Sequence, residues 1–436
     1  MTERDTAFGT ELRRRRLAVG LSLSQLAARI HYTKGYLSKI ETGRKLPSPD
    51  MARRCDTVLN AEGELAALVE RPTSGAPDEP DLGDRGDAWL LRLGPVGDCE
   101  FVPATPSDTA PESSDDAVPP WHGASRRALA AAANAERIDA TLAVFRSQFE
   151  QARVQGQVMP PDTVLPTVIT QTNTLRALAA VAAEPERGRL LLLAARCAEF
   201  VGWMTQEKGN DQRALWWTRT ATRLVEPTGD PAMAAYAMVR RAEMALYRDD
   251  AVQVIRLARA AQEQPGVPPR VRGLAAQREA QGLALYGDHD GYRRGLERAS
   301  ALLEAAKDAG GDEPIIGSST GSDLDPVVAG WCLHDLGCPE EAAELLDQAL
   351  PLIAARGLRA RLRFGTRRAL AYAAAGEIDR ACELTSELLD LVDVVDSATI
   401  RVDLRRLARS LVRRHAHPSV REIYPRIMTA LHTATA

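Results

Sequence analysis

Residues 20–55 read GLSLSQLAARIHYTKGYLSKIETGRKLPSPDMARRC, and this stretch decides the fold of the N-terminal part of the chain. Short amphipathic segments alternate here with residues that start or stop helices. Gly20 suits the left-handed position that ends a helix, whereas Ser22, Ser24 and Thr33 are good N-caps. Together with the flanking residues, the pattern predicts five short helices between Phe8 and about Val69.

Apolar residues recur in this region at helical spacing and predict its core. In the first helix, residues 8–19, we expect Leu12 and Leu17 inside and Arg13 to Arg16 mostly outside. The core residues expected from the following helices are Leu26, Ala27, Ile30, Leu37, Ile40, Met51, Cys55, Val58 and Leu59.

This stretch closely resembles the helix-turn-helix domains of phage repressors and Xre-type regulators. The ending Ile40-Glu41-Thr42-Gly43 matches the family's I-E-x-G, and His31 stands in the turn where the family usually carries Gly. Histidine tolerates a positive φ better than branched residues do. The resemblance implies a five-helix, lambda-repressor-like DNA-binding domain over residues 1–70, with residues 33–42 as the recognition helix.

The resemblance also implies which residues contact double-stranded DNA. The base contacts expected in the major groove come from Thr33, Lys34, Gly35, Tyr36, Ser38 and Lys39. The phosphate contacts expected beside it come from Ser24, Gln25, Arg44, Lys45 and Arg15. Glu41 is expected to brace the domain by pairing with a first-helix arginine, Arg13 or Arg16.

The charge of the chain is distributed unevenly. Residues 1–60 hold 12 Lys and Arg against six Asp and Glu, a net +6, whereas residues 70–120 hold three against 12, a net −9. A basic head suits phosphate contacts, and an acidic, Pro- and Gly-rich stretch predicts a mostly extended linker over residues 71–124. The insert at residues 89–102, WLLRLGPVGDCEFV, is the exception and could form a short strand pair.

From Ser125 to the end, helical periodicity is broken by turns that repeat. Equivalent positions in the second helix of each unit are separated by 40, 38, 50, 39 and 39 residues. These positions are Ala214, Val254, Tyr292, Ala342, Ala381 and Val420. A period of this length predicts an α-solenoid of helical hairpins over residues 125–436, so the whole chain is expected to be all-α.

The hairpins resemble tetratricopeptide repeats. A small residue in the first helix of each unit lets the two helices approach closely, and these residues are Gly202, Ala242, Ala280, Gly330 and Ala369. A helix-turn-helix head joined to such repeats resembles two bacterial groups. One comprises the quorum-sensing receptors that bind peptides, and the other comprises actinobacterial regulators of development and antibiotic production. The scarcity of lysine, five residues against fifty arginines, favours the second group, as does the segment AEFVGWMTQEKGNDQRALWW at residues 198–217.

Few residues point to small-molecule chemistry. Trp203, Trp217 and Arg240 are the expected members of a ligand groove in the repeats, although adjacent tryptophans more often pack in a core. His334 with Cys338 lacks further metal ligands, so neither a metal site nor a cofactor is predicted. We found no P-loop, GxSxG or HExxH motif, which argues against an enzyme.

The sequence therefore favours a DNA-binding transcriptional regulator of development or secondary metabolism. Its repeats are expected to form a homodimer, to sense a peptide, protein or small molecule, or both. The alternative is a repeat-based protein-interaction scaffold that binds DNA weakly and without specificity. No apolar leader or membrane span is evident, so the expected location is the cytoplasm, on the nucleoid.

Overall fold

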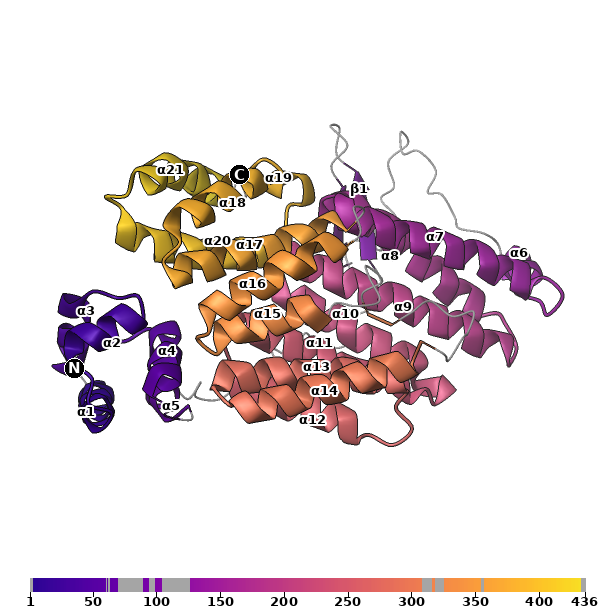
Figure 1. The fold of residues 1–436 in the computed structure, drawn as a ribbon. Coiled ribbons are helices and arrows are strands. Elements are labelled where there is room, and N and C mark those ends of the chain that lie inside the picture. The colour runs from indigo at the N-terminus through magenta and orange to yellow at the C-terminus, as the bar shows by residue number, and fades with distance from the viewer. Residues whose placement is uncertain are drawn as a thin grey trace.

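The N-terminal head is a bundle of short helices with its own core (Figure 1). The computed structural model describes residues 3–59, 61, 63–69, 89–93, 99–103, 126–307, 316–317, 325–353 and 357–432. The helices of the head are α1 (Glu3–Ala18), α2 (Leu23–Arg29), α3 (Lys34–Glu41), α4 (Pro49–Leu59) and α5 (Glu64–Val69). Eight of the nine core residues predicted in α2 to α4 are buried, and Val58 packs against them half-buried.

The first helix corrects one sequence prediction. Leu12 is buried as expected, but the side chain of Leu17 is 58% exposed and Arg16 takes the inward position instead. Leu12 and Arg16 are four residues apart and share a helix face, whereas Leu17 is turned away from it. Arg16 can occupy this buried position because Glu41 of α3 provides a carboxylate that pairs with it.

Part of the predicted linker forms a strand pair. Strands β1 (Trp89–Leu93) and β2 (Cys99–Pro103) are antiparallel, with Leu91 opposite Phe101. The strand pair that the sequence suggested for residues 89–102 is therefore present, as a β-hairpin. The other residues of the acidic stretch, 71–88, 94–98 and 104–124, lie outside the described residues.

The rest of the described chain is helical, and its helices form successive hairpins. The first part comprises α6 (Arg126–Ala132), α7 (Ile138–Val158), α8 (Pro161–Ala179), α9 (Glu186–Glu207), α10 (Asp211–Val225), α11 (Pro231–Tyr247) and α12 (Ala251–Glu263). The second part comprises α13 (Pro269–Tyr286), α14 (His289–Ala305), α15 (Asp325–Asp335), α16 (Pro339–Ala349), α17 (Leu358–Ala375), α18 (Ile378–Leu389), α19 (Val392–Val395), α20 (Ala398–Leu411) and α21 (Pro418–His432). Short 3-10 turns, η1 (Glu226–Thr228), η2 (Leu350–Leu352) and η3 (Val412–Arg414), follow α10, α16 and α20.

The hairpin period read from the sequence is confirmed. All six positions predicted to be equivalent lie in the second helix of a hairpin, and each is at most 9% exposed. The small residues in the first helix of each hairpin allow the second helix to pack closely against it. A Cβ on Gly330 would lie 2.6 Å from the Leu346 side chain, and one on Gly202 would lie 3.2 Å from the Ala214 carbonyl oxygen. The two helices of a hairpin therefore pack at a distance that larger side chains would prevent.

The solenoid curves until its two ends meet. Helix α7 packs against α17 and α19, and α9 packs against α20, so the first hairpins contact the last (Figure 1). This closure places side chains that are about 150–200 residues apart in one interior. The head lies at the left of Figure 1, beside the turns that join the helices of the later hairpins.

Candidate nucleic-acid interface

Local hydrogen bonds shape the helix-turn-helix unit, which consists of α2, α3 and the turn between them. Ser22 caps α2 in a capping box with Gln25, whose side-chain oxygen accepts from the Ser22 backbone N–H at 2.8 Å. Thr33 caps α3 by accepting from the Tyr36 N–H at 3.2 Å. Between them His31 adopts the left-handed conformation, with φ of 56°, as the resemblance implied. Of the two caps considered for α2, Ser22 and Ser24, the structure uses Ser22, and the predicted cap Thr33 and the predicted turn are present.

A buried ion pair fixes α3 against α1. Arg16 donates from Nε to Glu41 at 2.6 Å and from Nη2 at 2.9 Å, and its Nη1 donates to the Leu21 carbonyl at 2.8 Å. This pairing raises the pKa of Arg16. Of the two partners expected for Glu41, the structure uses Arg16, and Arg13 stays exposed. Gly9 permits the contact, since a Cβ there would lie 2.9 Å from the Glu41 carbonyl oxygen.

The outward face of α3 carries cations that the head does not neutralise. Lys34, Gly35, Ser38 and Lys39 are exposed, as is the N-cap Thr33. Within the described residues, Lys34 and Lys39 form no ion pair with any carboxylate. A helix that presents unpaired ammonium groups beside small side chains can enter a major groove and donate to base edges.

Tyr36 is half-buried and takes part in a stack. The Lys45 ammonium lies 4.6 Å from the centre of the Tyr36 ring, and the Tyr32 ring lies 5.3 Å away on a tilted plane. Cation–π contact holds Lys45 close to α3, where the family resemblance expects a phosphate contact. The structure therefore brings Tyr36 of α3 and Lys45 together as one surface.

The other predicted phosphate contacts lie in two places. Ser24, Gln25 and Arg44 are exposed, and Arg44 forms no ion pair within the described residues. Arg15 is only 17% exposed and binds Glu11 at 2.7 Å and also Glu64. It therefore joins α1 to the start of α5 and is less available to a phosphate than Arg44.

A second surface of the head, which the sequence did not reveal, contacts the repeats. Arg54 donates from Nη1 to the Ala374 carbonyl at 3.0 Å, and Thr57 donates to the Leu336 carbonyl. His31 Nε2 lies 2.9 Å from Glu340 Oε1. These repeat residues belong to the turns between α15 and α16 and between α17 and α18, or lie directly beside them.

Glycines in those turns make the close approach possible. Gly287, Gly337 and Gly376 all have positive φ, and each sits in the turn of a successive hairpin. A Cβ on Gly337 would lie 3.0 Å from the Arg54 Cα, and one on Gly376 would lie 3.2 Å from His31 Nδ1. These glycines thus form the turns and also provide the space into which the head fits.

The predicted ligand-groove residues lie in the interior of the repeats. Trp217 is 6% exposed and packs edge-to-face on Trp216, which agrees with a core role. Trp203 contacts the Phe200 ring at 5.5 Å and the Arg359 guanidinium at 5.8 Å.

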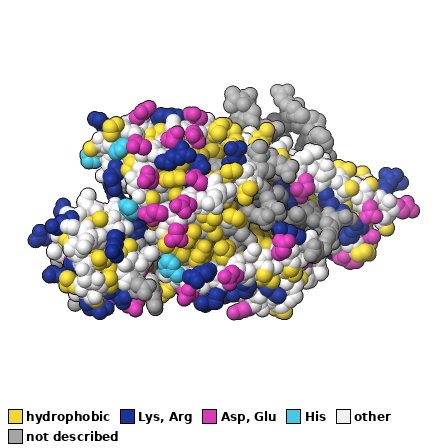
Figure 2. Space-filling view, in the orientation of Figure 1, with side chains coloured by type: hydrophobic (Ala, Val, Ile, Leu, Met, Phe, Trp, Pro, Cys, Tyr) yellow, Lys and Arg dark blue, Asp and Glu magenta, His cyan; other side chains and the backbone are white. Residues whose placement is uncertain are grey.

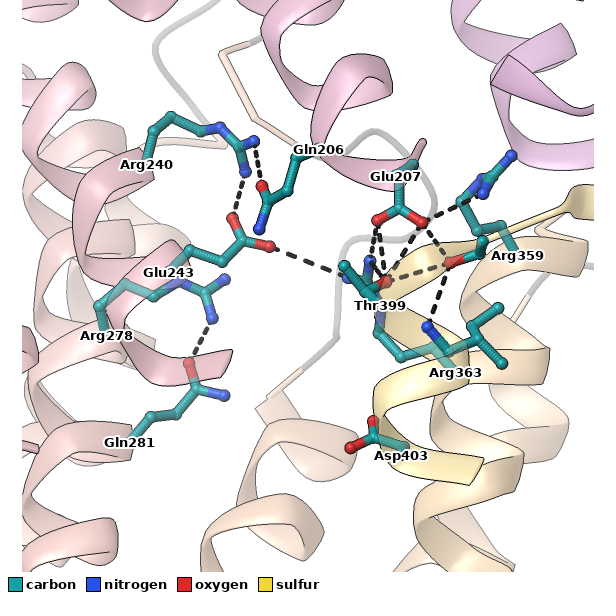
Figure 3. A network of polar contacts seen from close by, with 12 residues as sticks. Gln206, Glu207, Arg240, Glu243, Arg278, Gln281, Arg359, Arg363, Thr399 and Asp403 are labelled. Carbon is teal, nitrogen blue, oxygen red and sulfur yellow. Dashed lines mark hydrogen bonds and ion pairs between the residues drawn. The ribbon is translucent and has the colours of Figure 1, made fainter. Parts of the chain in front are cut away.

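Arg240 is 2% exposed and belongs to a network of buried polar groups (Figure 3). Its Nη2 donates to Gln206 at 2.6 Å, and its Nη1 binds Glu243. Burial acts to raise the pKa of Glu243, but Arg240, Arg278 and Arg363 outweigh burial and lower it to about 2.

Glu207 lies at the centre of this network (Figure 3). It is fully buried at the end of α9 and accepts from Arg359 at 3.1 Å, from Arg363, and from the Ser397 and Thr399 hydroxyls. Burial acts to raise the pKa of Glu207, but the two guanidinium groups outweigh it and hold the pKa below its usual value. Since its partners belong to α17 and the start of α20, Glu207 joins the early hairpins to the late ones.

Metal-ligand clusters and membrane-spanning helices were looked for in the described part of the chain. No group of three or more His, Cys, Asp or Glu side chains there could hold a metal ion. None of the described helices is long and apolar enough to cross a membrane.

Comparison with known proteins identifies the head. Residues 7–69 match the family described as "Helix-turn-helix domain". No curated protein matches the chain. Among solved structures, the "Crystal Structure of Rap Protein Complexed with Competence and Sporulation Factor" covers 71% of this chain and 97% of its own, at 14% identity and a TM-score of 0.40.

Proposed function

We propose that this protein is a sequence-specific DNA-binding transcriptional regulator. The observation that carries the proposal is the outward face of α3, where Lys34 and Lys39 are exposed and have no carboxylate partner in the described part of the chain. An unpaired ammonium group on a short, capped helix can donate to guanine O6 and N7. Thr33, Gly35, Tyr36 and Ser38 would line the same groove.

Phosphate contacts would orient the head on the duplex. Arg44 and Lys45 follow α3 directly, and Ser24 and Gln25 lie at the start of α2. Arg15 would have to leave Glu11 and Glu64 before it could reach a phosphate. One head buries little DNA surface, so a homodimer with two heads on a repeated half-site would give operator-grade affinity.

The repeats would supply regulation rather than catalysis. In this proposal they dimerise, or sense a peptide, protein or small molecule, and thereby set the spacing of two heads. The Arg- and Ala-rich composition supports an actinobacterial regulator of development or antibiotic production. Such a regulator would act in the cytoplasm on the nucleoid.

The test is to select duplexes from a random pool with the full chain and to footprint the enriched sequence at about 50 and 150 mM salt. A specific regulator protects one site at both concentrations, because its base contacts add to the salt-sensitive phosphate term. Enrichment of no sequence, with protection lost at the higher salt, would instead support a protein-interaction scaffold with weak, non-specific DNA binding.

A further inference from the structure

The C-terminal hairpin, α20 with α21, is as basic as the head. Residues 398–432 contain eight arginines against one Asp and one Glu, a net +6 with histidine neutral. The head reaches the same net charge over residues 1–60. The chain as a whole is acidic, so a positive charge of this size in one hairpin raises the question of what these arginines bind.

Half of these arginines contact other residues of the protein. Arg401 pairs with Asp396, Arg406 with Asp249 and Asp403, and Arg426 with Asp390. A fourth, Arg413, contacts the head, as described below. These contacts account for the part of the charge that stabilises the fold.

The remaining arginines are exposed and have no carboxylate partner among the described residues: Arg405, Arg409, Arg414 and Arg421. Arg405 and Arg409 are one helical turn apart, so they lie on the same face of α20. Arg413, a further turn on in η3, continues that face about 12 Å along the helix from Arg405, and the exposed Arg414 follows it in the chain.

A stack of side chains joins this hairpin to the recognition helix. The Arg413 guanidinium lies 4.8 Å from the centre of the Tyr32 ring in the helix-turn-helix turn. Tyr32 contacts Tyr36 on α3, and Lys45 covers Tyr36. In Figure 1 the α20–α21 turn lies above α2 and α3, and Figure 2 shows Lys and Arg side chains at the left of both units.

We propose that Arg405, Arg409 and Arg414 form a second DNA-binding surface, which contacts the phosphate backbone of the duplex held by α3. The inference rests on the proposed function of the head. Arg413 stacks on Tyr32, and Tyr32 precedes Lys34 by only two residues. The turn between α20 and α21 therefore lies close to the groove that α3 would enter. Guanidinium groups without protein partners suit phosphate oxygens, which they bind in a bidentate manner.

Carboxylates lie at the margins of this surface. Asp379 accepts from Ser419 at 2.6 Å and lies 3.9 Å from His417, and Glu340 is held by His31. Both are engaged by neighbours, and neither pairs with Arg409 or Arg414. The hairpin therefore offers a DNA backbone a net positive edge.

The experiment measures the salt dependence of binding to a selected duplex for the full chain and for the double variant R409A/R414A. Loss of two phosphate contacts lowers the slope of log K against log[salt] by about 1.8 and weakens binding at ~150 mM salt by about tenfold. Hydroxyl-radical footprinting should show fewer protected backbone positions beside the half-site, while dimethyl sulfate should show that the guanines contacted by α3 remain protected. R409K/R414K should retain most of the slope, because the charge is kept.

The matched control is R127A/R137A, which removes two exposed arginines around α6, at the opposite end of the repeats in Figure 1. It should bind as the wild type does. If R409A/R414A keeps the wild-type slope and footprint while Lys34→Ala loses the site, the second surface is refuted and the proposed function stands. If the wild-type chain selects no duplex at all, the proposed function itself fails.

Discussion

The head and the interior of the repeats use cations in opposite ways. On the outer face of the head, Lys34, Lys39 and Arg44 are exposed and unpaired within the described residues. In the interior of the repeats, Arg359 is 1% exposed and binds Glu207, two backbone carbonyls of the α7 end and the Val395 carbonyl. The exposed cations of the head are available to bind a partner, whereas the buried arginines of the repeats are already bonded to groups of the protein itself.

The difference follows from solvation. A buried charge is costly unless partners replace its water, so the interior arginines need carboxylates and carbonyls in fixed positions. An exposed lysine keeps its water at no cost and can exchange it for a phosphate or a base edge. Mutations should therefore affect stability in the interior and DNA affinity in the head.

The largest effect should come from Glu207→Ala. This change leaves Arg359 and Arg363 buried without their shared carboxylate, and breaking a buried pair costs about 3–5 kcal/mol. Denaturant unfolding of the full chain would measure the loss, with hydrogen exchange to locate it in α17 and α20.

Asp139→Asn is the control for that change. Its pair with Arg189 is surface-exposed, with Asp139 at 81% exposure, and such pairs contribute about 0–1 kcal/mol. If the two variants lost similar stability, the interior network would not be what closes the repeats.

The next largest effect concerns Lys34. Removing one base contact should cost about 1–3 kcal/mol of specific binding and relax sequence preference at one position. Replacing Arg44 should weaken all sequences alike and lower the salt slope by about one unit. Titrations of both variants with the selected duplex and with a scrambled one separate the two roles. Equal losses on both duplexes for Lys34→Ala would contradict its assignment to the recognition surface.

Much of the fold could be predicted because its signals are local. The caps Ser22 and Thr33 and the turn at His31 depend on a few neighbouring residues, and the structure contains all three. The hairpins could be predicted because each repeats the same short pattern. Leu17 was placed wrongly because helix phase alone does not show that an arginine can be buried beside a carboxylate from another helix.

The contacts between distant segments could not be predicted in this way. Glu207 contacts Arg359 only because the solenoid curves through several hairpins. The spacing of the repeats in the sequence does not reveal how strongly the solenoid curves. Likewise Gly337 was recognisable as a turn residue, but not as the place where Arg54 would pack. The signal available in the sequence was a glycine in the turn of each successive hairpin, and only the assembled structure shows that these turns lie along one edge.

A smaller effect concerns how the stability of the head and the stability of the repeats depend on pH. Burial raises the pKa of Asp56 to about 6, although the Leu65 and Ala66 N–H groups donate to its carboxylate. Because the folded pKa lies above the usual value of 3.8, protonation favours the folded head as pH falls from about 6 toward 3.8. Glu207 and Glu243 have lowered pKa values, so they contribute stability to the repeats that is lost only below their usual value of 4.5.

Between pH 7 and pH 5, Asp56 should therefore make the head more stable by about 1 kcal/mol. Hydrogen exchange of α4 and α5 amides in the full chain, corrected for intrinsic rates, measures this difference. Asp56→Asn should abolish it. A head that exchanged faster at pH 5 than at pH 7 would show that the two backbone hydrogen bonds outweigh burial.

The smallest effect tests whether the contact between the two regions influences DNA binding. Glu340 is 58% exposed and is held beside the turn that precedes α3 by His31. A negative charge at this position repels phosphates, but solvent and salt screen it. Glu340→Gln should strengthen binding by about twofold at ~50 mM salt and change it little at ~300 mM, because exposed charges contribute about 0.2–1 kcal/mol at most. The distant Glu136→Gln should have no such effect, since it lies near α6. Weaker binding by Glu340→Gln at both salt concentrations would mean that the His31 contact holds the head in the orientation that DNA requires, and that this positioning outweighs the repulsion.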